Sequence, residues 1–407
     1  MKTKYNLIYG DKYKWYQNRK EKLVKDFNLL FNEEPTNFFS SPGRVEILGN
    51  HTDHNQGLVL VSSINLDIFA AVSKRDDNMI YLKSRGYSMN IIDLSDLDIK
   101  ESEYSKSNSI IRGVSNKLKE LGYKIGGFNC TTESLIFKGA GISSSAAFEL
   151  LIGEIINNLY NDGLIDKVTL AKVGQYAENV YYNKPSGLLD QMGVSLGGFN
   201  FIDFKEKENP QIEHFNIDLK KYRVVLINTG GSHGNLTPLY KSIKDDMINT
   251  AKLFNKSVLR ELPEKDFYDN IPLIKRKLGG RAILRSIHFF DENKRVLSGY
   301  KALKNDNVDE FLKLINESGD SSYRLLENCF VQKDNKQGIS LAVNLSKLYL
   351  ENTGAVRVHG GGFKGTVIAY VPLKKKSDYI SKMKKVFGER NVVLVKLRQV
   401  GTTEVIE

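Results

Sequence analysis

The sequence predicts an α+β protein of two domains. Its 407 residues, of which 41% are apolar, can bury a large core, and this length favours two domains over one. Strand-like and helix-like segments are mixed, without the steady alternation that is typical of a parallel βαβ protein. Strand patterns also return near the end of the chain, after a mainly helical stretch. Together these observations indicate the α+β class.

The first half of the chain is expected to begin with a helix and to continue with mixed strands and helices. Residues 13–31 carry apolar positions at helical period, and Pro35 breaks the chain after them. Apolar segments bounded by polar turns predict strands, and a periodic segment that ends at Gly122 predicts a helix. Strands are expected within 36–75 and at 79–83, 89–94 and 126–137, and helices at 109–121, 143–160 and 168–182.

The second half is expected to be mainly helical and to end in strands. A charged linker at 205–214 separates two strand patterns, 199–204 and 222–228. Periodic apolar positions predict helices, and short runs rich in β-branched residues predict strands. The helices are expected at 239–256, 264–277, 280–290, 307–328, 338–351 and 376–386, and the last strands at 355–359, 366–371 and 392–400.

The composition argues against nucleic-acid and membrane partners. The net charge of +11 comes from lysines spread over the chain, and no zinc-ligand or RNA-binding signature accompanies them. The sequence has no run of 18 apolar residues, no signal-peptide pattern and no lipidation motif. Cys130 and Cys329 lie in apolar contexts, which favours buried thiols over a disulfide. We therefore expect a soluble cytoplasmic protein that acts as a monomer.

The segment from Lys138 to Tyr160 has the pattern of a phosphate-binding turn. A strand pattern leads into small residues at 139–141, and a helix pattern follows the serines at 143–145. Small residues allow close backbone approach, and N–H groups at a helix N-terminus attract phosphate. A tight turn without a ligand is the alternative. The segment is neither a P-loop nor a dinucleotide fingerprint, and the literal G-x-G-x-x-G at 360–365 precedes a strand pattern rather than a helix.

A second segment with chemical potential is the polar loop that follows Arg44. It holds Asn50, His51, Asp53, His54 and Asn55. Three interpretations remain open: a metal site, a turn held by Asn and Asp side chains, or a site for a polyhydroxylated ligand. Asp190, in the segment GLLDQ, is a candidate general base, although a single loop aspartate is more often a turn or cap residue.

The chain resembles the GHMP kinase superfamily in three segments, which occur in the order PGRVEILGNHTDHNQG, KGAGISSSAA and VHGGGFKGTVIAY. The first segment is similar to the galactokinase signature in particular. Three further segments extend the resemblance over nearly the whole chain, namely GLLDQ at 187–191, NTGGSHGNLTPLY at 228–240 and GGRAILRSIHFFDENKRV at 279–296.

The resemblance implies a two-domain GHMP kinase fold with the active site in the cleft between an N-terminal domain, 1–212, and a C-terminal domain, 213–407. It also implies that ATP, with Mg²⁺, phosphorylates a monosaccharide at its anomeric hydroxyl. The expected sugar is D-galactose, and the expected product is α-D-galactose 1-phosphate. The alternatives are another sugar, such as N-acetylgalactosamine, arabinose or galacturonate, and a catalytically silent sugar sensor.

The resemblance further implies roles for individual residues. Asp190 matches the catalytic aspartate that accepts the proton of the anomeric hydroxyl. Arg44 matches the arginine that orients this aspartate and stabilises charge on the transferring phosphoryl group. Ser145 and Glu178 match the magnesium ligands. The expected ATP contacts are Ser84 and the loop Gly139, Ala140, Gly141, Ile142, Ser143, Ser144 and Ser145. The expected sugar contacts are Asn50, His51, Thr52, Asp53, Gly187 and Tyr240.

The sequence departs from the galactokinase pattern at Asn50, where the family has glutamate, and at His54, where it has tyrosine. The glutamate normally contacts the end of the sugar remote from the reacting hydroxyl. We therefore expect Asn50 to form a neutral hydrogen bond there and to widen the range of accepted sugars. In the third motif, Lys364 and Thr366 stand where glycine and cysteine are common. Lys364 either adds a cation beside the phosphate site or points to solvent.

Overall fold

The computed structural model describes residues 2–136, 142–206, 208–217, 219, 221–230, 236–332 and 334–407. Gly139, Ala140 and Gly141 of the expected phosphate loop lie outside these described residues. Within the described part, the strands form two sheets, one of nine strands and one of four, and helices pack on both. The mixture of helices with mainly antiparallel sheets confirms the predicted α+β class.

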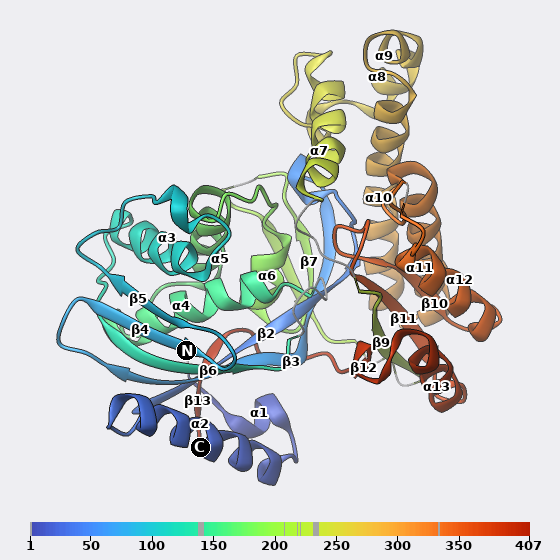
Figure 1. Cartoon of the computed structure of the whole chain (residues 1–407). Coiled ribbons are helices and arrows are strands. Elements are labelled where there is room, and N and C mark those ends of the chain that lie inside the picture. The colour runs from blue at the N-terminus through green and yellow to red at the C-terminus, as the bar shows by residue number, and fades with distance from the viewer. Residues whose placement is uncertain are drawn as a thin grey trace.

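The large sheet combines strands from both ends of the chain (Figure 1). Its strands are β1 (Lys2–Lys4), β2 (Asn37–Leu48), β3 (Leu58–Lys74), β4 (Met79–Ser84), β5 (Met89–Asp93), β6 (Phe128–Ser134), β7 (Phe199–Asp203), β8 (Gln211–Phe215) and β13 (Thr403–Ile406). Their order is β1-β13-β2-β3-β6-β4-β5, and β7 pairs with the first half of β3 and carries β8. The long strand β3 is antiparallel to β2, β6 and β7, so it joins all parts of the sheet.

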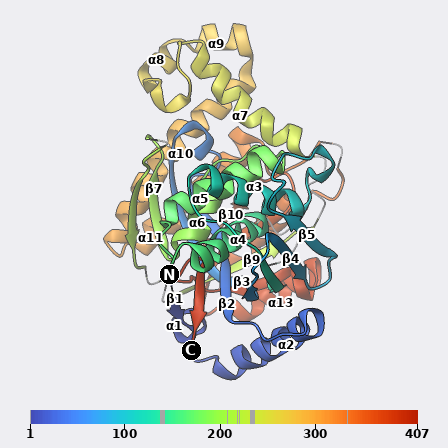
Figure 2. The ribbon, with the colours of Figure 1, turned by 90° about the vertical axis from the view of Figure 1, so that its left-hand side faces the viewer.

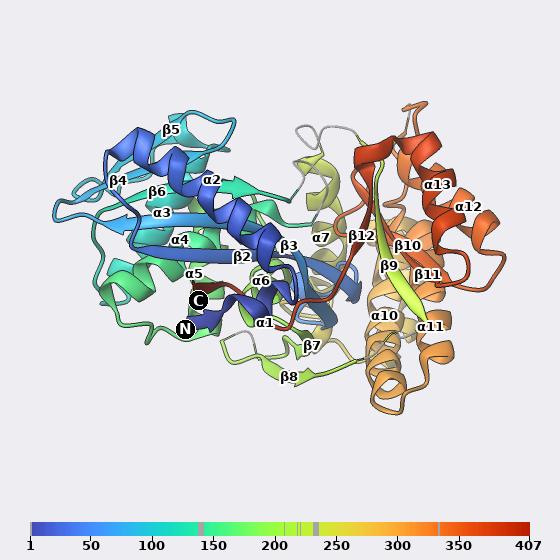
Figure 3. The same ribbon diagram turned by 90° about the horizontal axis from the view of Figure 1, so that it is seen from below.

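Helices cover both faces of the large sheet because β3 is apolar on both faces. Ile68, Ala70 and Val72 point into the main core, whereas Phe69 and Ala71 point into a smaller core on the opposite face. The helices α1 (Tyr5–Tyr9) and α2 (Tyr13–Phe31) cover the second face, as Figure 3 shows from below. The first face is covered by α3 (Ser107–Glu120), α4 (Ser144–Tyr160), α5 (Lys167–Tyr176) and α6 (Leu189–Leu196).

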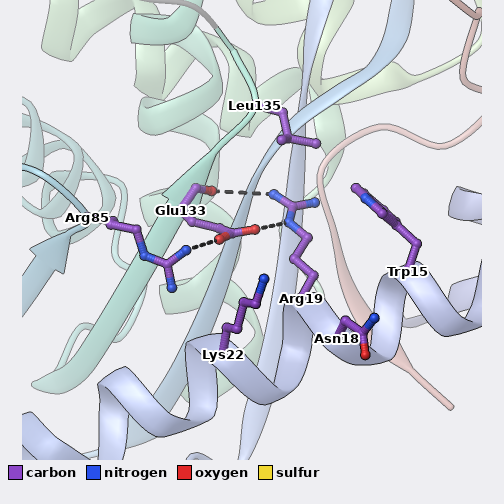
Figure 4. A pocket seen from close by; sticks show the side chains of 7 residues that line it. All are labelled: Trp15, Asn18, Arg19, Lys22, Arg85, Glu133 and Leu135. Atoms are coloured by element: carbon purple, nitrogen blue, oxygen red, sulfur yellow. Dashed lines mark hydrogen bonds and ion pairs between the residues drawn. The ribbon is translucent and has the colours of Figure 1, made fainter.

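Buried charges attach α2 to the large sheet. Arg19 donates from Nη1 to Asp67 Oδ1 at 2.7 Å and from Nε to Glu133. Arg85 donates to the other carboxylate oxygen of Glu133 at 2.5 Å, so two arginines hold this group (Figure 4). These side chains border a polar pocket, which is lined by Trp15, Asn18, Arg19, Lys22, Arg85, Glu133 and Leu135. The arginines there join helix to sheet, and none of the expected site residues lines this pocket.

The small sheet belongs to the second half of the chain and runs in the order β10-β11-β9-β12. Its strands are β9 (Tyr222–Asn228), β10 (Ala355–His359), β11 (Thr366–Pro372) and β12 (Val392–Val395). Val225 and Ile227 face a core formed with α12 (Gly338–Leu350) and α13 (Lys376–Phe387). Val224 and Leu226, on the other face of β9, join the main core. One buried core therefore extends from the large sheet to the small one.

Two groups of helices complete the second half. The helices α10 (Gly280–Lys304) and α11 (Val308–Ser321) contact strands of both sheets, namely β3 and β10. A separate cluster joins α10 to α7 (Thr237–Lys252), α8 (Glu264–Asp269) and α9 (Ile271–Leu278), which form the upper part of Figure 2. Two π-helical turns, η3 (Ala177–Tyr181) and η5 (Ser322–Leu326), follow α5 and α11. Short 3-10 turns are η1 (Asp53–Asn55), η2 (Glu101–Glu103), η4 (Leu259–Glu261) and η6 (Glu389–Asn391).

Most expected elements are confirmed, and the differences have local causes. The helix expected at 264–277 is split into α8 and α9, because Pro272 stands in the first turn of α9 and cannot continue a helix interior. The linker expected at 205–214 contains part of β8, and the strand expected at 392–400 ends at Val395. The domain division after residue 212 stays a prediction, since β8 spans it and β13 returns to the large sheet.

A buried ion pair joins the two sheets. Arg357 of β10 is fully buried and donates from Nη2 to Glu46 Oε1 of β2 at 2.5 Å and from Nη1 to the carbonyl oxygen of Ile47 at 2.8 Å. His359 Nε2 accepts the backbone N–H of Glu46 at 3.0 Å. Burial raises the pKa of Glu46, and Arg357 opposes that rise. The pair therefore fixes β2 against β10, and β2 is the strand that carries Arg44.

We predict that Arg357→Leu lowers the free energy of unfolding by about 3 kcal/mol or more, because it leaves the Glu46 carboxylate buried without its partner. The double variant Glu46→Leu/Arg357→Leu should recover part of this loss. Urea unfolding measures both, and Lys265→Met, which removes an exposed i,i+4 pair with Asp269, is the control. A loss for Arg357→Leu no larger than that of the control would contradict the prediction.

Candidate active site

Asp190 is brought beside Arg44 by the close packing of α6 on the large sheet. Gly193, one turn after Asp190, lies against the sheet so closely that a Cβ atom there would stand 2.5 Å from Val61 Cγ2 and 3.1 Å from Arg44 Cβ. Only glycine allows this approach without displacement of the sheet. The first turn of α6 therefore places Asp190 over the side chain of Arg44.

Arg44 and Asp190 form a directional ion pair. Arg44 Nε donates to Asp190 Oδ1 at 2.8 Å, and Nη2 lies 2.7 Å from the same oxygen. The side chain of Arg44 is 4% exposed, whereas that of Asp190 is 30% exposed, so the carboxylate keeps an open side. Burial alone would raise the pKa of Asp190, but Arg44 and then the hydroxyl of Ser143 outweigh it and hold this pKa below its ordinary value. Asp190 is therefore ionised at neutral pH.

Ser143 connects the start of α4 to the same carboxylate. Its backbone is left-handed, with φ +58°, and its hydroxyl donates to Asp190 Oδ2. The backbone N–H of Arg44 donates to the carbonyl oxygen of Ile142 at 3.4 Å. The residues that end the expected phosphate loop thus contact both members of the Arg44–Asp190 pair.

Ser145 and Glu178 lie together, as their expected roles require. Ser145 Oγ donates to Glu178 Oε1 at 2.9 Å, and the Glu178 carboxylate is 1% exposed. Glu178 stands on the π-helical turn η3, a local widening that recurs at functional sites. Burial opposes ionisation of Glu178, but Lys184 and Ser186 outweigh it and keep its pKa below the ordinary value. Ser143, the N-cap of α4, therefore donates to the ionised carboxylate of Asp190, and Ser145 of α4 donates to that of Glu178.

This donor set fits Mg²⁺ of the kind that phosphoryl-transfer enzymes use. Mg²⁺ commonly takes one or two carboxylates, completes its shell with waters and substrate phosphates, and rarely needs an all-protein cage. Among the described residues, no group of three or more His, Cys, Asp or Glu side chains is arranged to hold a metal. One carboxylate and one hydroxyl therefore suit a metal that arrives with a polyphosphate.

Four of the expected sugar contacts are partly exposed, namely His51, Asp53, Gly187 and Tyr240. A Cβ atom on Gly187 would stand 1.7 Å from Asp53 Oδ2, so only glycine fits beside this carboxylate. Asp53 accepts the backbone N–H of His54 at 2.9 Å and that of Leu189 at 3.3 Å. Burial raises the pKa of Asp53 to about 6. Asp53 is thus tied to the residue just before Asp190.

A hydrogen-bond chain fixes the histidines of this loop. His51 Nε2 donates to the carbonyl oxygen of Gly361 at 3.0 Å, so His51 Nδ1 accepts from His54 Nε2 at 3.3 Å. Asn55 Nδ2 then donates to His54 Nδ1 at 2.8 Å. Burial lowers the pKa of His51 to about 4, so the ring is neutral at pH 7. The third glycine-rich segment, around Gly361, therefore contacts the polar loop that holds His51 and His54.

Tyr240 lies across the same glycine-rich segment. Its hydroxyl donates to the carbonyl oxygen of Gly362 at 3.1 Å, and its ring packs edge-on against Phe363 at 5.5 Å. Tyr240 comes from α7, so the site is built where the large-sheet unit meets the second half of the chain. Lys364 of the third motif forms an ion pair with Asp334 at 3.0 Å, so its ammonium is directed at this carboxylate.

Asn50 and Thr52 differ from the other expected sugar contacts, because both are fully buried. Asn50 Nδ2 donates to Glu46 Oε1 at 3.0 Å and to the Gly360 carbonyl oxygen at 2.8 Å. Its Oδ1 accepts from Asn328 at 2.9 Å and from Ser322 at 3.2 Å, so all four hydrogen-bonding positions are used inside the protein. The hydroxyl of Thr52 likewise donates to backbone carbonyls, at 2.8 and 2.9 Å. Both side chains therefore make their hydrogen bonds within the protein.

The remaining expected ATP contacts stay predictions. Ser84, at the end of β4, accepts a hydrogen bond from Thr132 at 2.8 Å, and Ser144 is exposed at the start of α4. Ile142 is 1% exposed, and its carbonyl oxygen accepts the backbone N–H of Arg44.

Sequence reasoning missed four residues around Glu178. Gln191 Nε2 donates to Glu178 Oε2 at 3.0 Å and to Glu149 Oε2 at 2.9 Å. Burial, with Glu178 nearby, raises the pKa of Glu149 well above its ordinary value. Ser186 and Lys184 donate to Glu178 at 2.7 and 2.6 Å. The i,i+4 spacing of Ser145 and Glu149 on one helix could have indicated Glu149. The loop residues Lys184 and Ser186 have no such spacing in the sequence.

We predict that Asn50→Glu destabilises the protein by about 2–4 kcal/mol rather than changing its sugar preference. The new carboxylate cannot donate to Gly360 and would face the Glu46 carboxylate in a buried site. Urea unfolding measures the loss, with the exposed Asn344→Glu of α12 as control. A stable Asn50→Glu protein with an altered ranking of galactose and 6-deoxygalactose would show that Asn50 does face the sugar.

None of the helices in the described ranges is both long enough and apolar enough to cross a membrane. Cys130 and Cys329 are buried free thiols, as expected.

The sequence of the chain matches known families and relatives. The galactokinase galactose-binding signature matches residues 25–74, and the GHMP kinases N terminal domain matches residues 108–198. The galactokinase of Clostridium tetani is 32% identical over 377 residues, which cover 91% of this chain and 92% of the relative. The galactokinase of Lactobacillus helveticus is 28% identical over 379 residues, 91% of this chain and 94% of the relative.

Solved structures agree with the sequence comparisons. The Lactococcus lactis galactokinase complexed with galactose superimposes with a TM-score of 0.83 at 25% identity, over 95% of this chain and 99% of that one. A mevalonate kinase has the same fold, with a TM-score of 0.63 at 16% identity over 89% of this chain and 99% of that chain. The two-domain GHMP kinase fold expected from the sequence is thereby confirmed. The signature in the loop after Arg44, the identity over nearly the full length and the shared fold lead to one conclusion: the chain belongs to the galactokinase family of the GHMP kinases.

Proposed function

We propose that the protein transfers the γ-phosphoryl group of ATP to the anomeric hydroxyl of D-galactose and so makes α-D-galactose 1-phosphate and ADP. The observation that carries this proposal is the Asp190 carboxylate, which Arg44 and Ser143 hold from two sides while its third side is open. Membership of the galactokinase family supports galactose as the sugar.

In this proposal the anomeric hydroxyl of the sugar donates to Asp190. The reaction breaks the bond between the γ-phosphorus and the oxygen that bridges it to the β-phosphate, and it forms a bond from the γ-phosphorus to O1. ADP leaves with the bridging oxygen, and the O1 proton passes through Asp190 to solvent. Because Arg44 lowers the pKa of Asp190, this carboxylate is a weak base, and the proton leaves late, when the new O–P bond has made it acidic.

Other residues bind and orient the two substrates. Asp53, His51 and Tyr240 face the sugar hydroxyls, and Gly187 leaves room for the Asp53 carboxylate. Ser143, Ser144 and Ser145, at the N-terminus of α4, bind phosphate oxygens, since free N–H groups and the helix dipole both favour an anion there. Ser145 and Glu178 would hold Mg²⁺, which neutralises phosphate charge in such transfers.

The experiment that tests the proposal measures ADP release with a panel of monosaccharides. Galactose, 6-deoxygalactose, N-acetylgalactosamine, arabinose and galacturonate are compared at equal concentration, and we expect galactose to give the highest kcat/KM. A higher value for another sugar would contradict galactose as the substrate, and ADP release with none of them would contradict the kinase proposal.

We predict that Asp190→Asn reduces kcat by at least about a hundredfold while the affinity for ATP stays unchanged, because the amide keeps the size of the side chain but cannot accept the O1 proton. Stopped assays measure kcat, and calorimetry measures ATP affinity. The control is Asp203→Asn, since Asp203 also pairs with an arginine, Arg260, at 2.7 Å. A variant that turns over near the wild-type rate would falsify the role of Asp190.

We also predict that galactose affinity falls about tenfold between pH 7 and pH 5, because the Asp53 carboxyl takes up a proton near pH 6 and then accepts fewer hydrogen bonds from the sugar. Protonation of Asp53 has the opposite effect on folding and stabilises the folded protein, because burial raises the pKa of Asp53 from 3.8 to about 6. This stabilisation is fully present below pH 3.8 and is lost as the pH rises through about 6. Calorimetric titrations with galactose measure the affinity. Asp53→Asn should bind galactose weakly at every pH, and an unchanged pH profile in this variant would contradict the assignment.

A further inference from the structure

Lys184 is a cation at the reaction centre that none of the expected roles includes. It lies in the loop between η3 and α6, where Asn183 has a left-handed backbone with φ +61°. The backbone N–H of Lys184 donates to the carbonyl oxygen of Glu178 at 3.0 Å. The loop thus turns back on the residue expected to bind the metal. The Lys184 side chain is 47% exposed, whereas the Glu178 carboxylate that it reaches is 1% exposed.

The contacts of Glu178 show that Lys184 stands where a ligand has to be accommodated. Lys184 Nζ donates to Glu178 Oε1 at 2.6 Å, and Ser145 Oγ donates to the same oxygen at 2.9 Å. The other oxygen, Oε2, accepts from Ser186 at 2.7 Å and from Gln191 at 3.0 Å. A divalent cation on Ser145 and Glu178 would repel the ammonium from Oε1, so Lys184 has to take another partner when the site is loaded.

Arg44, the cation that pairs with Asp190, is held in place more firmly than Lys184. Arg44 is almost completely buried, and two of its nitrogens are directed at Asp190. Lys184 differs, because its ammonium is at the end of a flexible stem that is half exposed, so its charge can change partner. The strongest anion that arrives beside Ser145 in a kinase is the nucleotide polyphosphate.

We propose that Lys184 is a phosphate-binding residue of the catalytic centre: its ammonium neutralises Glu178 in the empty protein and moves to the terminal phosphates of ATP in the loaded one. This inference rests on the proposed kinase function and adds a residue to it. In the transfer, Lys184 stabilises negative charge on the phosphate oxygens, while Arg44 stays on Asp190. The alternative is an ion pair that only holds the loop.

The test measures binding of a non-hydrolysable ATP analogue in the presence of Mg²⁺, because Lys184 is proposed to leave Glu178 when the site is loaded with metal and nucleotide. Calorimetry should give a dissociation constant about tenfold higher for Lys184→Met than for wild type, as expected for the loss of one charge-assisted contact. Lys184→Arg should stay within about threefold, because it keeps the charge. The matched control is Lys347→Met, because Lys347 is 41% exposed and pairs with Asp320 at the same 2.6 Å. The Lys347→Met protein should bind the nucleotide as tightly as wild type.

A second measurement uses the unmodified protein and so does not depend on the folding of a variant. Acetic anhydride labels lysines at limiting concentration, and mass spectrometry compares the labelling of Lys184 and Lys347 with and without Mg²⁺ and the ATP analogue. Mg²⁺ and the analogue together should slow the labelling of Lys184 several-fold and leave that of Lys347 unchanged. Equal labelling of Lys184 in both conditions, or equal affinity of wild type and Lys184→Met for the analogue, overturns the role of Lys184 alone. A wild-type chain that binds no ATP contradicts the proposed kinase function itself.

Discussion

The ion pair between Arg44 and Asp190 is the constraint on which the rest of the site depends. It fixes the first turn of α6 on β2, and Ser143 at the start of α4 holds the other oxygen of the carboxylate. Three segments that are far apart in the sequence therefore meet at one carboxylate. The same pair explains why this carboxylate orients a hydroxyl more than it attracts a proton, since a neighbouring guanidinium stabilises the ionised form.

The position of Arg44 depends in turn on the junction between the two sheets. Two residues along β2, Glu46 is held by Arg357 of β10, and Asn50 links the end of the same segment to Gly360, Ser322 and Asn328. The backbone N–H of Gly49 donates to Glu292 of α10 at 2.9 Å. Because each of these buried polar groups has a defined partner, they fix the position of the polar loop after β2 relative to the second half of the chain.

The sequence was sufficient for the fold class, for most helices and strands and for the pairs Arg44–Asp190 and Ser145–Glu178, because local periodicity and motif order carry that information. It did not indicate the buried hydrogen-bond network of Asn50, because a polar residue within a ligand motif looks the same whether it faces a sugar or such a network. It also failed at Lys184, since its contact with Glu178 follows from the path of the loop at 183–187 and not from any spacing. The strand β13 was missed because four residues at the chain end have no pattern until β2 pairs with them.

The central claim is that the open side of Asp190 faces the anomeric hydroxyl of galactose. A crystal structure with galactose and a non-hydrolysable ATP analogue tests it most directly. We expect the O1 atom of galactose to lie about 2.6–3.2 Å from a carboxylate oxygen of Asp190, with the γ-phosphate of the analogue on the other side of O1. A sugar that places a different hydroxyl against Asp190, or that binds without contacting this carboxylate, would contradict the account.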